Sequence, residues 1–492
     1  MRDSGGRIRR VVGFITVGAV TFCGAYVALL RQRRSPDALD ASRAQRTARI
    51  AKLGARRARR TAFHKARRTF ASTQRRIDLD ATHQMQSAQD VAAVLGEMKG
   101  ALMKLGQMAS YLDETMPAPM REALATLQQD APPMSAALAA SVIVSELGEH
   151  PNELFAEWDP VPMASASIGQ VHKAITQDGR AVAVKVQYPG VDAAIRADLD
   201  NTDMLFRLIG LAFPGLDGKT VVTELRARII EELDYSIEAR NQTLFAEWYR
   251  DHPFIHVPSV IFELSTPRVL TTDLVDGARF DDLLTWPQQE QQLAAETIFR
   301  FVFRSIYRIA AFNGDPHPGN YLFAKGGHVT FLDFGLVKHY DPPEVQLFSD
   351  LIHAMCFEHD ITKFRSLIEH AGILQETATI SDEQVQDYFG HFYDFVRENR
   401  VVTFNAEYAS DTVRKMFDLT SPSAAVAKQS NVPPAFVITQ RINLGLHAIL
   451  AQLNATANWR CIAEELWPWV GGTPTTDLGQ LEADWLAANP RA

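Results

Sequence analysis

Apolar residues recur along the chain with two different periodicities. The first, near the start, is typical of helices, and the second, further along, is typical of strands. Over residues 88–112 apolar side chains recur at steps of three and four, as on one face of a helix, and residues 135–147 repeat this pattern over a shorter length. Beyond about residue 160, residues 168–175 and 181–187 alternate as strands do, on either side of Gln177-Asp178-Gly179. The sequence therefore predicts a β-hairpin there.

The remainder of the chain predicts a few more strands and then mainly helices. Residues 220–250 are typical of one long helix, residues 260–274 of two strands, and residues 271–277 of a hinge into a second lobe. Further helices are expected at residues 296–312, 343–359, 382–400 and 437–453. Strands gathered in one part and helices in the other predict an α+β fold with two lobes.

The N-terminal residues predict a membrane anchor. Residues 11–30 contain no charged side chain, and about 20 apolar residues are what a membrane-spanning helix needs. The segment runs straight into arginines without a small-residue cleavage site, which argues against a cleaved signal peptide. Because the heavier positive charge follows the span, we expect a single-pass protein whose body lies in the cytoplasm.

Charge and cysteine content narrow the classes of partner. The 492-residue chain has a net charge of −8, but residues 1–76 are strongly basic and the rest is acidic. An acidic body argues against nucleic acid as a partner, whereas the basic segment suits an anionic phospholipid surface. Residues 42–76, rich in Ala and Arg, fit either a helix on lipid headgroups or a solvated linker. The three dispersed cysteines argue against a disulfide framework and a zinc site, and fit a reducing compartment.

Two acidic turns carry the candidate chemistry. The first is Asn313-Gly314-Asp315-Pro316-His317-Pro318-Gly319-Asn320, and the second is Asp333-Phe334-Gly335. This spacing is how a kinase-like lobe holds a nucleotide: Asp315 would orient or deprotonate the acceptor, and Asn320 and Asp333 would hold Mg²⁺. A hairpin of residues 321–324 and 328–332 would bring the two ligands together. The alternative is an ordinary polar turn.

The first predicted hairpin carries a candidate phosphate-binding site. Residues 164–171 match the register of the kinase glycine loop, with alanine at its first two glycine positions, so Ala164, Ser165, Ala166 and Ser167 are candidate nucleotide-binding residues. Lys185 on the second strand would hold the phosphates. Glu238, from an acidic cluster on the long helix, would orient this lysine. A surface lysine on an edge strand and a solvated acidic face are the structural alternatives.

With these motifs in order, the chain from about residue 88 to residue 467 resembles the ABC1/ADCK/UbiB family of atypical, protein-kinase-like proteins. Lys104, Gly106 and Gln107 are similar to its K-x-G-Q signature, and Glu232 and Asp234 to its E-x-D motif. The resemblance implies a bilobal protein-kinase-like fold with an N-terminal helical extension. It also implies that the extension occludes the peptide site, with Lys104 meeting Glu232 and Asp234.

The family resemblance further implies ATP/ADP and Mg²⁺ as cofactors and an ATPase or unorthodox kinase activity. A membrane lipid or isoprenoid intermediate is the implied partner, in quinone or other lipid metabolism, with a lipid-biosynthetic complex and a homodimer as further expectations. Two departures are Ser165, where the family often has alanine, and Asn313-Gly314, where protein kinases have His-Arg. Two other hypotheses remain open: a small-molecule phosphotransferase of the aminoglycoside or choline kinase type, and a nucleotide-sensing scaffold without turnover.

These signals predict a division of the chain into six parts. They are a membrane anchor (1–34), a basic juxtamembrane segment (35–86), the helical extension (87–160), an N-lobe (161–276), a C-lobe (277–475) and a polar tail (476–492).

Overall fold

A computed structural model describes residues 134–166, 168–192, 195, 230–314, 316–409, 411, 426, 429–430 and 445–490. The predicted span at 11–30, the basic segment 42–76, the helix at 88–112 and the residues Lys104, Gly106, Gln107, Ser167 and Asp315 lie outside the described residues. Within the described part of the chain, no helix is both long and apolar enough to cross a membrane.

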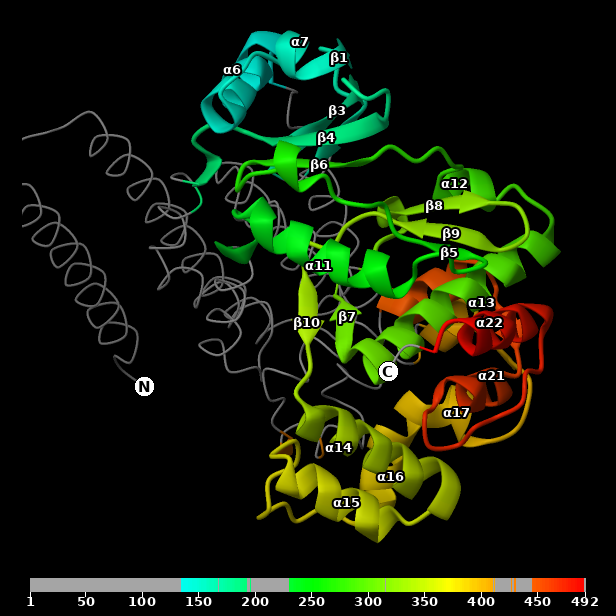
Figure 1. Ribbon diagram of the computed structural model, residues 1–492. Helices are drawn as coiled ribbons and strands as arrows, with labels where there is room; N and C mark the ends of the chain where they lie inside the picture. The colour runs from blue at the N-terminus through cyan, green and yellow to red at the C-terminus, as the bar shows by residue number, and fades with distance from the viewer. Residues whose placement is uncertain are drawn as a thin grey trace, which may run out of the picture. The chain divides into compact units, whose positions relative to one another are not determined.

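The N-lobe is an antiparallel sheet packed against one helix (Figure 1). Helix α6 (Ala136–Leu147) is the predicted short helix; Ser135 caps its start and Gly148, at a φ of 86°, ends it. The strands of the N-lobe sheet are β1 (Phe155–Trp158), β2 (Ala164–Ala166), β3 (Gly169–Thr176), β4 (Ala181–Gln187) and β6 (Val269–Asp273). Their order is β1-β3-β4-β6, with β2 paired to β3. The predicted hairpin is confirmed as β3–β4, and the short helix α7 (Pro151–Leu154) leads into β1.

The predicted helix over residues 220–250 is wrong for its described part. The chain turns at residues 232–233, and α11 (Tyr235–Trp248) begins only after Asp234, whose side chain accepts a hydrogen bond from the Ser236 amide at 2.9 Å. Aspartate caps helix starts better than it continues a helix, so the cap divides the acidic cluster. Of the two strands expected over residues 260–274, only β6 forms, since residues 262–264 adopt a 3₁₀ turn.

Below the sheet, two small sheets frame the candidate site. Strand β5 (Ile255–His256) pairs with β9 (His328–Phe331), which pairs with β8 (Tyr321–Ala324) to form the predicted second hairpin. Strand β7 (Ala311–Asn313) pairs with β10 (Val337–His339). The helix expected over residues 296–312 therefore ends early: α13 (Gln288–Arg304) passes into a π-turn at residues 305–309, and Ala310 takes a left-handed φ of 52° before β7.

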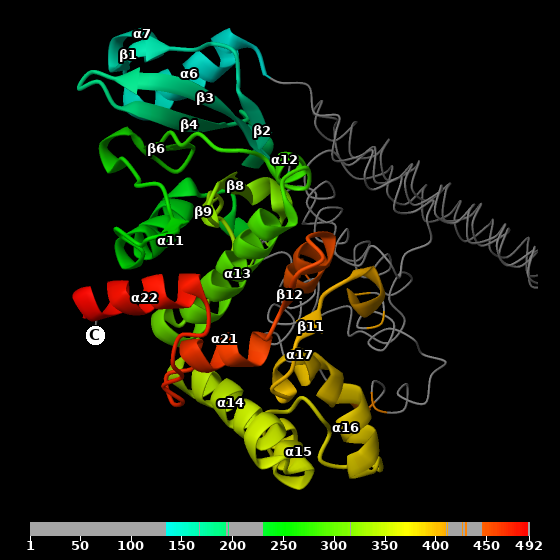
Figure 2. The same ribbon diagram turned by 90° about the vertical axis from the view of Figure 1, so that its right-hand side faces the viewer.

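The C-lobe is mainly helical, and one more of its predicted helices is divided in the structure (Figure 2). The helix expected at 343–359 is α14 (Pro342–Ile352) followed by a π-turn, and the one expected at 382–400 is divided into α16 (Asp382–Gly390) and α17 (Asp394–Arg397). The lobe also contains α12 (Phe280–Leu283), α15 (Ile361–His370), α21 (Trp459–Leu466), α22 (Asp477–Ala488), the short pair β11 (Val402–Thr403) and β12 (Thr456–Ala457), and helical residues 445–452.

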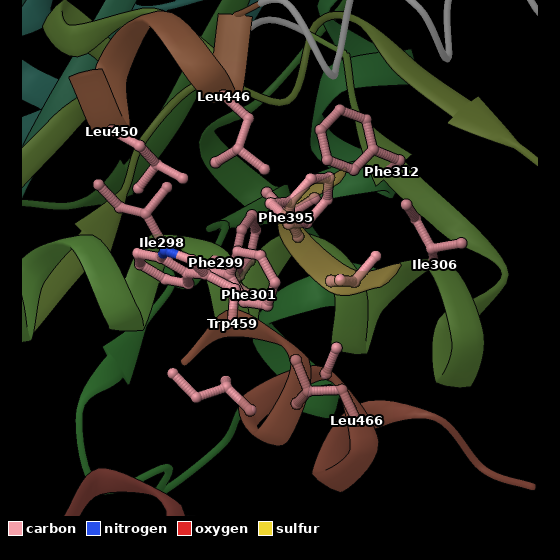
Figure 3. Packing of buried hydrophobic residues seen from close by; sticks show 14 of the residues in the cluster. Ile298, Phe299, Phe301, Ile306, Phe312, Phe395, Leu446, Leu450, Trp459 and Leu466 are labelled. Carbon is pink, nitrogen blue, oxygen red and sulfur yellow. The ribbon is translucent and has the colours of Figure 1, made fainter. Parts of the chain in front are cut away.

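Aromatic packing around α13 forms the core of the C-lobe. Phe299 is fully buried, with its ring centroid 4.8 Å from that of Trp459 on α21, and Phe395 of α17 meets the same cluster (Figure 3). Leu446 and Leu450 close this core from the helical residues 445–452. Burial of large aromatic side chains is the main driving force for packing these helices.

The polar tail predicted from residue 476 is wrong. Residues 477–488 form α22, in which Glu482 is 1% exposed and Trp485 is buried. Glu482 forms ion pairs with Arg300 and Arg304 of α13. Apolar residues recur in this helix at steps of three and four (Leu478, Leu481, Trp485), which is the pattern of a packed helix, but a glutamate at a buried position does not follow from that pattern.

Candidate nucleotide site

Lys185 and Glu238 form an ion pair between the sheet and α11. The Nζ atom of Lys185 lies 2.9 Å from Oε1 and 2.8 Å from Oε2 of Glu238. Strand β4 points Val184 and Val186 into the core and Lys185 to the opposite face, as the two-residue period of a strand requires. The side chains are only 16% and 5% exposed. The contact expected between these two residues is present, whereas the surface-lysine alternative is not.

Glu238 reaches Lys185 because of where α11 starts. Asp234 caps the helix, and the Tyr235 amide donates to the Pro267 carbonyl at 2.9 Å, which ties the helix start to the chain entering β6. Glu238 then lies in the first turn, where the helix dipole favours a carboxylate. The turn is also held to β4, since Gln187 donates from Nε2 to the Leu233 carbonyl at 3.1 Å.

Burial and neighbouring charges shift both titrating groups. Burial, opposed by the attraction of Lys185 and helped by the nearby carboxylate of Asp333, raises the pKa of Glu238 to about 7. Burial alone would lower the pKa of Lys185, but Glu238 and Asp333 outweigh it and raise that pKa well above its ordinary value. Lys185 therefore stays positive at neutral pH, as a residue that grips phosphate must.

Asp333 is the third charged group of this cluster. Its Oδ2 lies 3.8 Å from Lys185 Nζ, and its Oδ1 accepts a hydrogen bond from the Gly335 amide at 3.0 Å. The turn is anchored from below, because Phe334 is fully buried and Asn241 of α11 donates to its carbonyl at 3.1 Å. The Asp333 side chain itself remains 34% exposed. A partly exposed carboxylate on a rigid turn is suited to bind a cation.

Asn320 lies beside this turn. The Leu332 amide donates to the Asn320 carbonyl at 3.0 Å, so the hairpin brings residue 320 alongside the residue before Asp333, as the sequence predicted. In nucleotide sites Mg²⁺ takes one or two protein oxygens and completes its shell with phosphates and water. An amide and a carboxylate oxygen fit that ion. Among the described residues no group of three or more His, Cys, Asp or Glu side chains could cage a metal.

The flanks of the first acidic turn are held next to the second. Asn313 pairs with Val337 in the β7–β10 ladder and donates its side-chain amide to the Asp333 carbonyl. The Gly314 amide donates to the Leu336 carbonyl at 2.7 Å. Asp315 itself lies outside the described residues, so its role stays a prediction.

The alanine-rich segment forms the hairpin β2–β3. Ala164 pairs with Val171, Ser165 with Gln170 and Ala166 with Gly169, and Lys185 lies opposite Val171 on the neighbouring strand. The Ser165 side chain is exposed, while Ala164 and Ala166 are half-buried. The segment therefore lies beside Lys185, as a phosphate-covering loop would.

Glu232 and Asp234 are expected to contact Lys104, but Lys104 lies outside the described residues. Glu232 lies in the turn before α11 and Asp234 at its cap. Their role as partners of the helical extension thus stays a prediction.

Sequence reasoning missed Gln170. Its fully buried carboxamide accepts from the Met134 amide at 2.9 Å, donates to the Met134 carbonyl at 3.4 Å, and lies 2.9 Å from His172 Nε2. The His172 Nδ1 atom faces the Asp159 carbonyl at 2.9 Å, which fixes that nitrogen as a donor and Nε2 as the acceptor from Gln170. Inward strand positions are usually apolar, so the sequence around Gln170 does not predict a buried carboxamide there. Its partner Met134 is also far away in the sequence.

Comparison with known proteins agrees with this geometry. The profile of the ABC1 atypical kinase-like domain matches residues 126–367, which include Lys185, Glu238, Asn320 and Asp333. The chain belongs to the ABC1 family. Its fold is accordingly kinase-like.

Curated ABC1-family relatives match half or more of this chain. The chain spans only about half the length of those relatives. The atypical kinase coq-8 of Caenorhabditis elegans, described as mitochondrial, is 30% identical over 380 residues, covering 76% of this chain and 50% of that protein. The atypical kinase COQ8 of Saccharomyces cerevisiae, also described as mitochondrial, is 33% identical over 246 residues, covering 50% of this chain and 49% of that protein.

A solved structure resembles the fold over most of both chains. It is the Rv3197–erythromycin complex from Mycobacterium tuberculosis, 31% identical with a TM-score of 0.59, and the match covers 80% of this chain and 98% of that one. The similarity in fold and sequence extends beyond the residues matched by the family profile.

Proposed function

We propose that this ABC1-family protein is a Mg²⁺-dependent ATPase or atypical kinase that supports isoprenoid quinone or other membrane-lipid metabolism. The observation that carries the proposal is the ion pair of Lys185 with Glu238, 2.8 Å long, with Asp333 3.8 Å from the same ammonium group. A buried, oriented lysine beside a partly exposed carboxylate on a rigid turn is the arrangement that phosphoryl-transfer sites use.

Each residue has a distinct task in this proposal. Lys185 binds the phosphates and Glu238 holds its ammonium group in place. Asn320 and Asp333 provide oxygens for Mg²⁺, which offsets the negative charge of the phosphates when bound. Asp315 orients the water or acceptor. The alanine-rich hairpin covers the phosphates with less conformational freedom than a glycine loop would have.

Membrane association is the second part of the proposal. The uncharged residues 11–30 supply a single-pass anchor, and the basic residues 42–76 contact anionic phospholipid. The substrate or cargo would then be a membrane lipid or isoprenoid intermediate. The K-x-G-Q residues Lys104, Gly106 and Gln107, facing Glu232 and Asp234, would keep polypeptides out of the site.

The test is Mg²⁺-dependent ATP hydrolysis by the full chain, with and without liposomes containing anionic phospholipid. Wild-type protein should hydrolyse ATP, respond to the liposomes, and lose most activity in Asp333→Asn. Asp273→Asn is the matched control: Asp273 also forms a salt bridge in the N-lobe, to Arg180 at 2.6 Å, but on the side of β6 away from the ion pair with Glu238. Equal activity in wild type and Asp333→Asn would refute the proposal.

Two outcomes would favour the other hypotheses. Robust transfer of phosphate to a soluble alcohol or amine would indicate a small-molecule phosphotransferase. Preserved function in cells of an Asp315→Asn variant that still binds nucleotide would indicate a scaffold without turnover.

A further inference from the structure

Tyr235 places a buried hydroxyl group beside Lys185. The side chain is 2% exposed, and its oxygen has no hydrogen-bond partner among the residues that the structure describes. Buried polar atoms are nearly always hydrogen-bonded, because leaving one without a partner destabilises the fold. Several other buried side-chain atoms among the described residues also have no partner, and this hydroxyl is set apart from them by the position of its ring next to Lys185.

The hydroxyl lies on the face of the sheet that carries Lys185. Lys185 is paired with Val171 on β3, and Gly169 is two residues earlier, so these three positions share one face. A Cβ atom placed on Gly169 would lie 2.9 Å from the Tyr235 oxygen. Because Gly169 pairs with Ala166 next to the turn that joins β2 to β3, the hydroxyl lies close to the turn end of the alanine-rich hairpin.

The ring of Tyr235 also positions the lysine. The Nζ atom of Lys185 lies 4.9 Å from the ring centroid, within the range of a cation–π interaction. Tyr235 is the first residue of α11, and Glu238 follows one turn later on the same side of the helix. The lysine thus lies between an aromatic face and a carboxylate that come from a single helical turn.

The surroundings of the hydroxyl favour an anionic ligand. Burial raises the pKa of Tyr235, so the group keeps its proton and can donate a hydrogen bond. A donor that is already dehydrated and next to an ammonium group is complementary to a phosphate oxygen. It would gain its missing partner only when the ligand is bound.

We propose that Tyr235 is a further nucleotide-binding residue, whose hydroxyl donates to a phosphate oxygen of the nucleotide and whose ring seats Lys185. This inference rests on the proposed function, because it requires a nucleotide in the site. It assigns the phosphate contact to a residue outside the motifs described in the sequence.

The test compares Tyr235→Phe with Tyr249→Phe in the full chain. Both tyrosines belong to the α11 segment and are 2% exposed, but the Tyr249 hydroxyl is satisfied, at 2.9 Å from Ser305 Oγ and 3.3 Å from the Phe301 carbonyl. For each protein, binding of Mg·ATP, Mg·ADP and adenosine is measured by calorimetry, and thermal unfolding is followed without nucleotide.

The two variants should behave in opposite ways. Tyr235→Phe should weaken Mg·ATP and Mg·ADP about tenfold, as expected for one lost hydrogen bond to a charged group, leave adenosine unchanged, and not lower the midpoint of unfolding. Tyr249→Phe should lower the midpoint and leave nucleotide affinity intact. A purely structural tyrosine would not discriminate between ATP and adenosine.

The outcomes separate the two proposals. If wild type binds Mg·ATP and Tyr235→Phe binds it equally well or more tightly, the role of Tyr235 is refuted while the proposed function stands. If Tyr235→Phe weakens ATP and adenosine to the same extent, the hydroxyl has no phosphate contact and the inference also fails. If wild type does not bind Mg·ATP, both proposals fall together.

Discussion

Arg300 and Glu482 form a buried ion pair that joins two helices far apart in the sequence. The Nη1 atom of Arg300 lies 2.9 Å from Oε2 of Glu482, and the side chains are 0% and 1% exposed. Arg300 also pairs with Glu296 and Glu465, and Arg304 with Glu482. The helix α22 is therefore held to α13 by charges that have no access to water.

Glu482→Gln should strongly destabilise the fold. The change leaves the charges of Arg300 and Arg304 in a dry interior with one carboxylate fewer. Breaking a buried pair from one side typically destabilises a protein by about 3–5 kcal/mol. Urea unfolding followed by tryptophan fluorescence would measure the difference.

The control for this prediction is Glu358→Gln, which removes one carboxylate of the ion pair with Lys363, both side chains of which are over 40% exposed. Exposed pairs of this kind contribute little, so the unfolding curve should barely move. A Glu482→Gln protein as stable as this control would show that α22 is only loosely attached.

The ATPase activity should depend on the ionisation of Glu238 near neutral pH. Because burial raises its pKa to about 7, the pair with Lys185 reaches full charge only as the pH rises through that value. We expect kcat/KM for Mg·ATP to rise with pH on a limb centred near 7, and this limb to vanish in Glu238→Gln.

The stability contributed by Glu238 should change in the opposite direction. Its folded pKa is above its ordinary value of 4.5, so the folded state holds the proton more tightly than the unfolded state does. That contribution is complete below about pH 4.5 and is lost as the pH rises to about 7. The unfolding free energy of wild type minus that of Glu238→Gln, measured across this window, should decline; a rising difference would contradict it.

Gly169→Ala should damage both the hairpin and nucleotide binding. The new methyl group would overlap the Val186 carbonyl oxygen, a backbone atom that cannot swing away, and would press on the Tyr235 hydroxyl. Overpacking of this kind typically destabilises by about 1–3 kcal/mol. Thermal unfolding and Mg·ATP calorimetry would register the two effects.

Gly390→Ala is the matched substitution. Gly390 ends α16, and the nearest atom to its added Cβ would be 3.4 Å away, at the end of the Arg397 side chain. Because alanine favours a helix over glycine, this variant should be neutral or slightly stabilised. If Gly169→Ala were equally well tolerated, the close approach of Gly169 to Val186 and Tyr235 beside the hairpin turn would be of no consequence.

Gln170→Leu should loosen the entry of the chain at Met134. It removes the carboxamide that pairs with both backbone groups of Met134 and leaves His172 Nε2 without its donor. Loss of such buried hydrogen bonds typically destabilises by about 1–3 kcal/mol. Hydrogen exchange at the Met134 amide should accelerate, whereas Gln177→Leu, which removes an exposed bond to the Glu153 carbonyl, should leave it unchanged.

The elements that could be predicted are those whose signal is local. The β3–β4 hairpin follows from alternating residues around Asp178-Gly179, and Gly179 takes a φ of 87° as such turns require. The pairing of Lys185 with Glu238 was expected from motif order. The hairpin signal lies within one short stretch, whereas the second prediction joined two residues 53 positions apart through the order of the motifs that carry them.

The missed features depend on contacts between distant segments. Nothing near residue 300 indicates that α13 ends in a π-turn, and nothing near residue 482 indicates a buried carboxylate, since its arginine partners are contributed by another helix. The break before α11 was missed because Asp234 was assigned to a helix face rather than to a cap. Gln170 and Tyr235 likewise acquire their roles only from neighbours in space.

The separation of Arg300 from Glu482 also affects how the protein is made. The two residues are 182 positions apart, so at about 5–20 residues per second the ribosome needs roughly 10–40 s to deliver the second after the first. During that interval the nascent chain has α13 with two arginines and lacks the acid that completes their shell. The aromatic residues Phe299, Phe395 and Trp459 are all made before Glu482, so the docking of α22 on α13 is a late step that translation adds to a core already present in the chain.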